Sequence, residues 1–220
     1  MKSIKTIIGV ISITIVALAS LATAADLTDI TLPTPHREGG KPLLQALKER
    51  QSTRIFSTKK LPVQVLSDLL WAAFGINRPD SGKRTAPSAR NWQEVDIYAI
   101  MEDGPYLYDA KGNILRGVAK ADLRKLTGTQ EFVSTAPLNL VYVADITRMK
   151  GSGPEDQALY SGADVGFISQ NVYLFCASEG LATVVRASVD RGTLAKALNL
   201  PETKRIILAQ TVGYPGTDAR

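Results

Sequence analysis

A run of five residues combines two arginines with a hydroxyl group. Residues 50–54 read Arg-Gln-Ser-Thr-Arg and close a segment, 41–50, in which leucines recur at helical spacing. We expect this segment to be a helix whose end turns Arg50, Ser52 and Arg54 toward one site. Arginine grips phosphate through two parallel charge-assisted hydrogen bonds, so the run suits a phosphate-bearing ligand. The alternative is a basic helix end that only complements the helix dipole.

Composition argues against several other chemistries. His36 is the only histidine, which makes a Ser-His-Asp triad or a histidine-rich zinc site improbable, and no metal site is predicted. Cys176 is the only cysteine, so no internal disulfide can form, and its apolar surroundings place it in the core. The Gly-Ser-Gly at 151–153 fails the dinucleotide-binding pattern, no Walker loop is present, and no carboxylate pair has a glycosidase context.

The first 24 residues have the pattern of a secretory signal. Two lysines precede an apolar stretch from Ile7 to Ala22, and small residues end it at Ala24. We expect residues 1–24 to be cleaved and the mature chain to be periplasmic or secreted. A membrane anchor is the alternative, but the stretch is short and is interrupted by Ser and Thr. Of the 26 basic residues, 24 then remain against 21 acidic ones, too mild an excess to predict nucleic-acid binding.

Periodicity and turn residues predict the elements that position the run. Residues 25–40 read as an extended arm that either wraps a neighbouring subunit or is a frayed tail. Residues 41–220 form one α+β domain, with helices around a central sheet of about five strands. Helices are expected over 41–50, 61–75, 119–126, 154–179 and 191–198, and strands over 95–101, 106–108, 114–115, 138–144, 182–189 and 204–212.

The longest helical pattern, 154–179, is apolar on nearly every side between Val165 and Ala177. A helix that is apolar all round has to be buried all round. In a domain of this size the expected cover is a second subunit.

Five short motifs also occur in one order along the chain. They are residues 50–54, Ala-Pro-Ser-Ala-Arg-Asn-Trp-Gln at 86–93, Gly-Ala-Asp-Val-Gly at 162–166, Glu-Gly-Leu-Ala-Thr at 179–183 and Val-Gly-Tyr-Pro at 212–215. This series resembles the FMN-dependent nitroreductase superfamily and looks closest to the branch with azoline dehydrogenases of peptide-antibiotic biosynthesis. The resemblance covers residues 42–215. It implies a mixed central sheet, a long buried central helix and a homodimer that binds two FMN molecules in grooves between its subunits.

The resemblance assigns cofactor contacts to four segments. The run at 50–54 would hold the phosphate and the pyrimidine edge, its second residue through the backbone, and Arg220 could complete that site. The loop at 87–91 would reach the flavin from the partner chain, and the long helix would add two less consistent contacts. The strand at 185–187 would place a backbone N–H at flavin N5. The assigned residues are Arg50, Gln51, Ser52, Arg54, Pro87, Ser88, Ala89, Asn91, Asp164, Phe167, Val185, Arg186 and Ala187.

The residue types fit these roles. A flat apolar ring favours small residues against one face, and Pro-Ser-Ala at 87–89 supplies them. Reduction places negative charge near N1 and O2, which a fixed Arg54 would stabilise in a dry groove. Because the cofactor carries the chemistry, no catalytic histidine or cysteine is needed. The implied activity is an oxidoreductase that moves two electrons through flavin N5 to or from a small organic substrate by a ping-pong mechanism, with a redox partner or electron acceptor.

Plainer interpretations stay open. The Pro-Ser-Ala could be a turn, Arg186 could pair with an acid at a sheet edge, and Trp92 is expected to pack in the core. Four loop cations, Arg78, Lys83, Arg84 and Arg90, are either solvated surface or steer an anionic substrate. An exported enzyme would not meet NADH or NADPH, which favours a dehydrogenase. The alternative function is a non-catalytic exported protein that binds flavin or a partner on the same scaffold.

Overall fold

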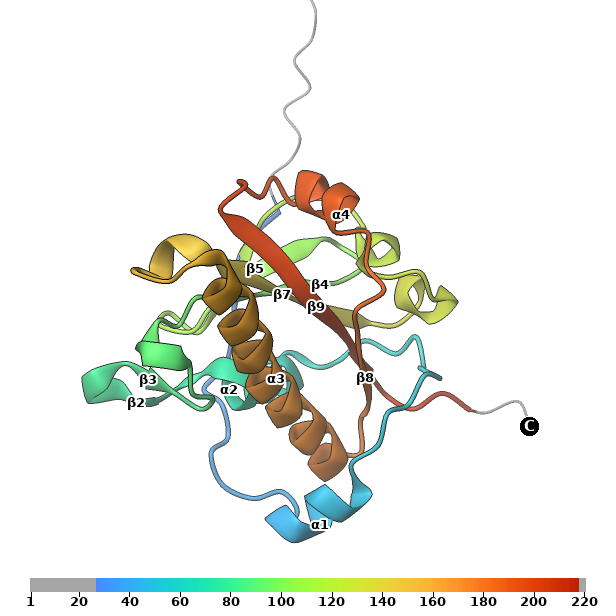
Figure 1. Ribbon diagram of the computed structural model, residues 1–220. Helices are drawn as coiled ribbons and strands as arrows, with labels where there is room; N and C mark the ends of the chain where they lie inside the picture. Colours follow the sequence, from blue (N-terminus) through green and yellow to red (C-terminus); the bar gives the residue numbers. More distant parts are fainter. Residues whose placement is uncertain (1–26, 218–220) are drawn as a thin grey trace, which may run out of the picture.

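The computed structural model describes residues 27–217, so the predicted signal and Arg220 lie outside the described residues. Seven strands form one sheet in the order β1-β6-β5-β4-β7-β9-β8, and a separate hairpin joins β2 to β3 (Figure 1). The strands are β1 Ile30–Thr31, β2 Ile76–Arg78, β3 Lys83–Arg84, β4 Val95–Ile100, β5 Pro105–Asp109, β6 Ile114–Gly117, β7 Leu138–Asp145, β8 Ala182–Arg186 and β9 Lys204–Gly213. The α-helices are α1 Leu43–Glu49, α2 Val63–Phe74, α3 Pro154–Glu179 and α4 Arg191–Ala197.

The predicted α+β class is confirmed, with two corrections to the sheet. It has seven strands instead of about five, partly because the arm adds β1 at one edge. Every neighbouring pair is antiparallel, where a mixed sheet was expected. The connection from β7 through α3 to β8 makes no parallel pair, because β9 lies between those two strands.

The helix predicted over 119–126 is wrong. Only a 3-10 turn, Arg124–Thr127, forms in this part of the chain. The Asp122 carboxylate accepts a hydrogen bond from the Arg124 backbone N–H at 3.1 Å and pairs with its guanidinium at 2.7 Å. Such local side-chain bonds offer the backbone an alternative to a helix.

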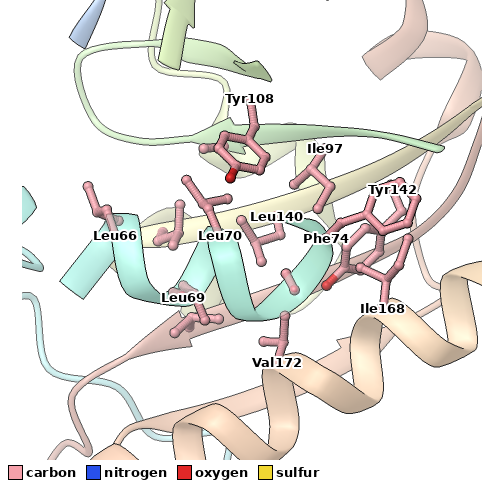
Figure 2. Close-up of a cluster of buried hydrophobic side chains, with 14 of the residues drawn as sticks. Leu66, Leu69, Leu70, Phe74, Ile97, Tyr108, Leu140, Tyr142, Ile168 and Val172 are labelled. Carbon is pink, nitrogen blue, oxygen red and sulfur yellow. The ribbon is translucent and has the colours of Figure 1, made fainter. Parts of the chain in front are cut away.

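Two hydrophobic layers cover the two faces of the sheet. On β7, Leu140 and Tyr142 face the α2–α3 layer, while Val141 and Val143 face α4. The helix predicted over 61–75 is confirmed as α2, and its leucines and Ala73 are buried. Figure 2 shows Phe74 of α2 meeting Tyr142 and the α3 side chains between helix and sheet. Cys176 is buried in the same layer, as expected.

The leucines of α1 do not pack on the domain's own core. Leu43, Leu44 and Leu47 are 63%, 79% and 45% exposed, and only Ala46 of this helix is buried. On α3, Leu159 and Phe167 are also exposed, so the helix is not covered on every side within one chain. Among the described residues, no helix combines the length and the apolar character that a bilayer crossing requires.

Within residues 27–36 the arm is not a frayed tail, because it packs against its own domain. Leu32 is buried, and its N–H donates to the Asn113 carbonyl at 3.1 Å. The Asn113 side-chain amide donates back to the carbonyls of Leu32 at 3.2 Å and Pro33 at 2.8 Å. His36 binds the Asp68 carboxylate through both its backbone N–H and its ring.

Asn113→Ala is expected to lower the free energy of unfolding by about 2 kcal/mol. The substitution removes two hydrogen bonds from the side chain to the arm. It also places alanine at a left-handed φ of 50°, which asparagine tolerates better because its side chain can hydrogen-bond locally. Asn113→Gly is the matched control, because it loses the same bonds but tolerates the left-handed backbone. In urea unfolding, the free energy of unfolding should be highest for wild type, lower for Asn113→Gly and lowest for Asn113→Ala. An alanine variant as stable as wild type would show that this side chain does not hold the arm.

Candidate functional site

The run at 50–54 begins at the end of α1, as predicted: Arg50 caps the helix through its N–H to the Ala46 carbonyl, and residues 51–54 continue outside any helix or strand. The Thr53 N–H donates to the Thr183 carbonyl of β8 at 2.9 Å. Further on, Phe56 forms an antiparallel bridge with Pro215. The run therefore lies beside the ends of β8 and β9, which brings three of the five sequence motifs together.

Tyr173 of α3 joins two predicted cofactor segments. Its hydroxyl lies 2.8 Å from Ser52 Oγ and accepts a hydrogen bond from the Val185 N–H at 3.0 Å. The Arg50 guanidinium lies 5.2 Å from the centre of its ring, within cation–π range. Sequence reasoning missed this residue, and its signal is a lone hydroxyl within the apolar stretch 172–176.

A cavity of about 570 Å³ opens beside this tyrosine. Its size falls within the range of small-molecule sites. Arg50, Gln51 and Thr53 of the run line it, whereas Ser52 and Arg54 do not. The other lining residues are Lys41, Lys48, Glu49, Tyr173, Cys176, Ala177, Gly180, Leu181, Ala182, Thr183 and Pro215.

The cavity carries a net positive charge. Lys41 Nζ lies 2.6 Å from the Glu49 carboxylate and 3.1 Å from the Ala177 carbonyl, so it neutralises the only acid there and the negative end of α3. No carboxylate of residues 27–217 forms an ion pair with Lys48 or Arg50. These two cations are left for an anionic group, as a phosphate site requires.

The loop predicted to meet the flavin lies further along α3. Its Ala89 N–H donates to the Asp164 carboxylate at 2.9 Å, and Ser88 Oγ accepts from the Gln93 N–H at 3.0 Å. Asp164 and Tyr173 are nine positions apart, about 14 Å along the helix axis. Within one chain, Pro87, Ser88, Ala89 and Asn91 are therefore not adjacent to the cavity at Arg50.

Glu94, at the end of this loop, is fully buried, and neither carboxylate oxygen has an N–H or O–H donor among the described residues. Burial, together with the neighbouring Asp164 carboxylate, raises the pKa of Glu94 to about 7, against the opposing charge of Arg148. Burial also raises the pKa of Asp164, while the Ala89 hydrogen bond lowers it. Sequence reasoning missed Glu94, whose signal is an acid directly before an apolar strand.

The three predicted residues at the end of β8, Val185 to Ala187, differ in burial and in hydrogen bonding. Val185 is half-buried and its N–H is bonded to Tyr173, while Ala187 is exposed. Arg186 is buried, and no acid among the described residues pairs with it, contrary to the sheet-edge interpretation. Its guanidinium donates to Thr127 O, Asn139 Oδ1 and Thr211 Oγ1 at 2.6–2.9 Å. Burial lowers its pKa to about 10, so it stays charged at neutral pH.

The remaining predicted residues lie at the surface or inside the β2–β3 region. Phe167, Asn91 and Arg54 are exposed. Arg84 is not a solvated cation, since its guanidinium donates to Phe74 O and to Gln93 Oε1. Trp92 packs edge-on against Tyr160. Within the described range no group of three or more His, Cys, Asp or Glu side chains could hold a metal ion.

Comparison with known proteins decides the family. The model of the nitroreductase family matches residues 47–214, which is most of the chain. The chain belongs to the nitroreductase family. Membership supports an oxidoreductase of the flavin-using type.

Individual relatives match most of this chain. A solved nitroreductase-type structure from Ralstonia eutropha JMP134 is 43% identical with a TM-score of 0.83, and the match covers 87% of this chain and 91% of that one. A Methanocaldococcus jannaschii protein named as a nitroreductase is 27% identical over 76% of this chain and 88% of its own length. The iodotyrosine deiodinase of Nematostella vectensis is 23% identical over 80% and 67%.

Proposed function

We propose that this nitroreductase-family protein is an FMN-dependent oxidoreductase that acts on a small organic substrate. The observation that carries the proposal is the cavity between the run at 50–54 and β8, where Lys48 and Arg50 are left without an acid. This donor set fits the phosphate of FMN, because two cations without an acidic partner favour a doubly charged anion.

The chain's own residues would bind and orient the cofactor. Arg50 would grip the phosphate, and Tyr173, which lines the cavity, is bonded to Ser52 and to the Val185 N–H behind it. When bound, FMN supplies two-electron transfer, so the protein needs only to position the ring and limit access of water. Pro87, Ser88 and Ala89 offer small side chains to such a ring.

The protein would work as a homodimer. The exposed leucines of α1 and the exposed Phe167 and Leu159 of α3 form apolar surface that a second subunit would bury. The loop at 87–91 does not line the cavity at Arg50 of its own chain. In a dimer, the corresponding loop of the second subunit could lie close to that cavity.

The motif order supports a place near the azoline-dehydrogenase branch, and the Escherichia coli microcin synthetase complex shares the fold at a TM-score of 0.66 and 20% identity. If residues 1–24 direct export, the mature protein does not meet cytoplasmic NADH or NADPH. A dehydrogenase that passes electrons to another acceptor fits that compartment better.

Purification of the mature chain tests the function. We expect a yellow dimer whose flavin absorbance bleaches with a chemical reductant and recovers rapidly with a quinone or a nitroaromatic acceptor. Flavin that is retained but does not turn over with any acceptor would instead support the non-catalytic flavin-binding alternative. A colourless monomer that takes up no FMN would reject both.

A further inference from the structure

Two acidic side chains lie buried together behind the loop at 87–93. Glu94 is 0% exposed and Asp164 is 2% exposed. Neither Glu94 carboxylate oxygen has a hydrogen-bond partner among the described residues, and the Asp164 carboxylate is the neighbouring acid. Two carboxylates can hydrogen-bond to each other only if one of them carries a proton.

The cations around the pair are already engaged. Arg148 donates to the Gln93 carbonyl at 3.0 Å and to Asp96 at 2.8 Å, and it also pairs with Asp145 at 3.4 Å. Arg84 donates to the Gln93 side chain. Because two buried negative charges without a bonded cation repel strongly, a shared proton is the low-energy arrangement.

The loop in front of the pair has an unusual backbone. Arg90, Asn91 and Gln93 all have positive φ, at 50°, 56° and 48°. Such conformations persist only where the surroundings enforce them, and they cluster at functional loops. The Asp164 carboxylate fixes the start of this loop through the Ala89 N–H at 2.9 Å.

We propose that Glu94 and Asp164 share one proton and form a clamp that positions the loop at 87–93 for the flavin, so that FMN affinity falls when this proton is lost. The flavin part rests on the proposed function, whereas the shared proton and the loop clamp do not. Glu94 and Asp164 are positioning residues, since they act on the cofactor through the Ala89 loop.

The direction of the pH effect follows from the two states of Glu94. An unfolded glutamate loses its proton near pH 4.5, while the folded chain keeps it to about pH 7. The contribution of this proton to the free energy of unfolding is complete below pH 4.5 and is lost as the pH rises toward 7. Above that range both carboxyls are charged, and the loop should loosen.

Infrared spectroscopy and amide exchange of the flavin-free protein test the clamp. At pH 6, wild type should show the carbonyl band of a protonated carboxylic acid, and Glu94→Gln should lack it. The Ala89 N–H should lose roughly tenfold in protection factor between pH 6 and 8.5 in wild type but not in Glu94→Gln, whose amide can donate to Asp164 at every pH. Glu102→Gln, an exposed change of equal charge, is the control and should behave as wild type.

Asp164→Asn provides a second variant. Its amide can donate to an ionised Glu94, so the acid band should disappear at a lower pH than in wild type. With FMN, wild-type affinity should fall roughly tenfold over the same pH range, and Glu94→Gln affinity should stay level. A wild-type spectrum without the acid band, or equal pH slopes in wild type and Glu94→Gln, would overturn the clamp. Absence of FMN binding at every pH would instead reject the proposed function. In that case the infrared band and the exchange of the Ala89 amide would still show whether the clamp exists.

Discussion

Replacing Arg50 by alanine will weaken FMN binding about a hundredfold. The guanidinium lines the cavity, stacks on Tyr173 and has no acidic partner among the described residues, so its charge is available to the phosphate. A hydrogen bond to a charged group contributes about 1.5–3 kcal/mol, and a bidentate grip lies at the upper end, near two factors of ten. Titration of FMN with flavin-free protein, monitored through the quenching of FMN fluorescence, measures the change in affinity.

Arg205→Ala is the matched control for this variant. Arg205 lies at the start of β9 and is exposed, and the substitution removes the same charge away from the cavity. Its FMN affinity should stay within about twofold of wild type, because exposed charges at a distance are screened. If both substitutions had the same small effect, the cavity at Arg50 would not hold the phosphate.

Arg186→Met will lower the free energy of unfolding by about 3–5 kcal/mol. The buried guanidinium donates to Thr127, Asn139 and Thr211, and methionine removes all three of these hydrogen bonds from the interior. The Thr127 carbonyl then loses its side-chain donor, while Asn139 Oδ1 keeps only the Thr211 hydroxyl. Arg186→Lys keeps the charge but not the fork geometry, so it should fall between wild type and methionine. Chemical unfolding of the three proteins gives the ranking, and a methionine variant as stable as wild type would contradict it.

Gly128 supplies an independent check on the same contact. Its backbone is extended, at φ 176°, but a Cβ there would collide with Arg186 Nη1. Gly128→Ala should therefore destabilise wild type and cost much less in the Arg186→Met background. A double-mutant cycle measures this coupling, and additive effects would show that the clash is absent.

Helix ends that depend on local signals were predictable from the sequence. Pro62 and Gly75 bracket α2, and Pro154 and Gly180 bracket α3, because proline suits a first turn and glycine suits the end of a helix. The strands with strong apolar runs, such as β7, were found for a similar reason.

Features that depend on distant partners were not predictable. The leucines of α1 have helical spacing, yet spacing does not tell whether the core or another surface covers them. The two-residue β1 forms only because β6 offers it an edge. Tyr173 and Glu94 gain their roles from Ser52, Val185 and Asp164, none of which is near them in sequence.

The central claim is that the cavity beside Tyr173 recognises the phosphate of a flavin nucleotide. Isothermal titration calorimetry with FMN and with riboflavin, which lacks only the phosphate, tests this claim most directly. The account predicts one FMN per chain and riboflavin binding at least about a hundredfold weaker, as expected for loss of a charged, bidentate contact. Equal affinity for the two compounds, or no binding of either, would contradict it.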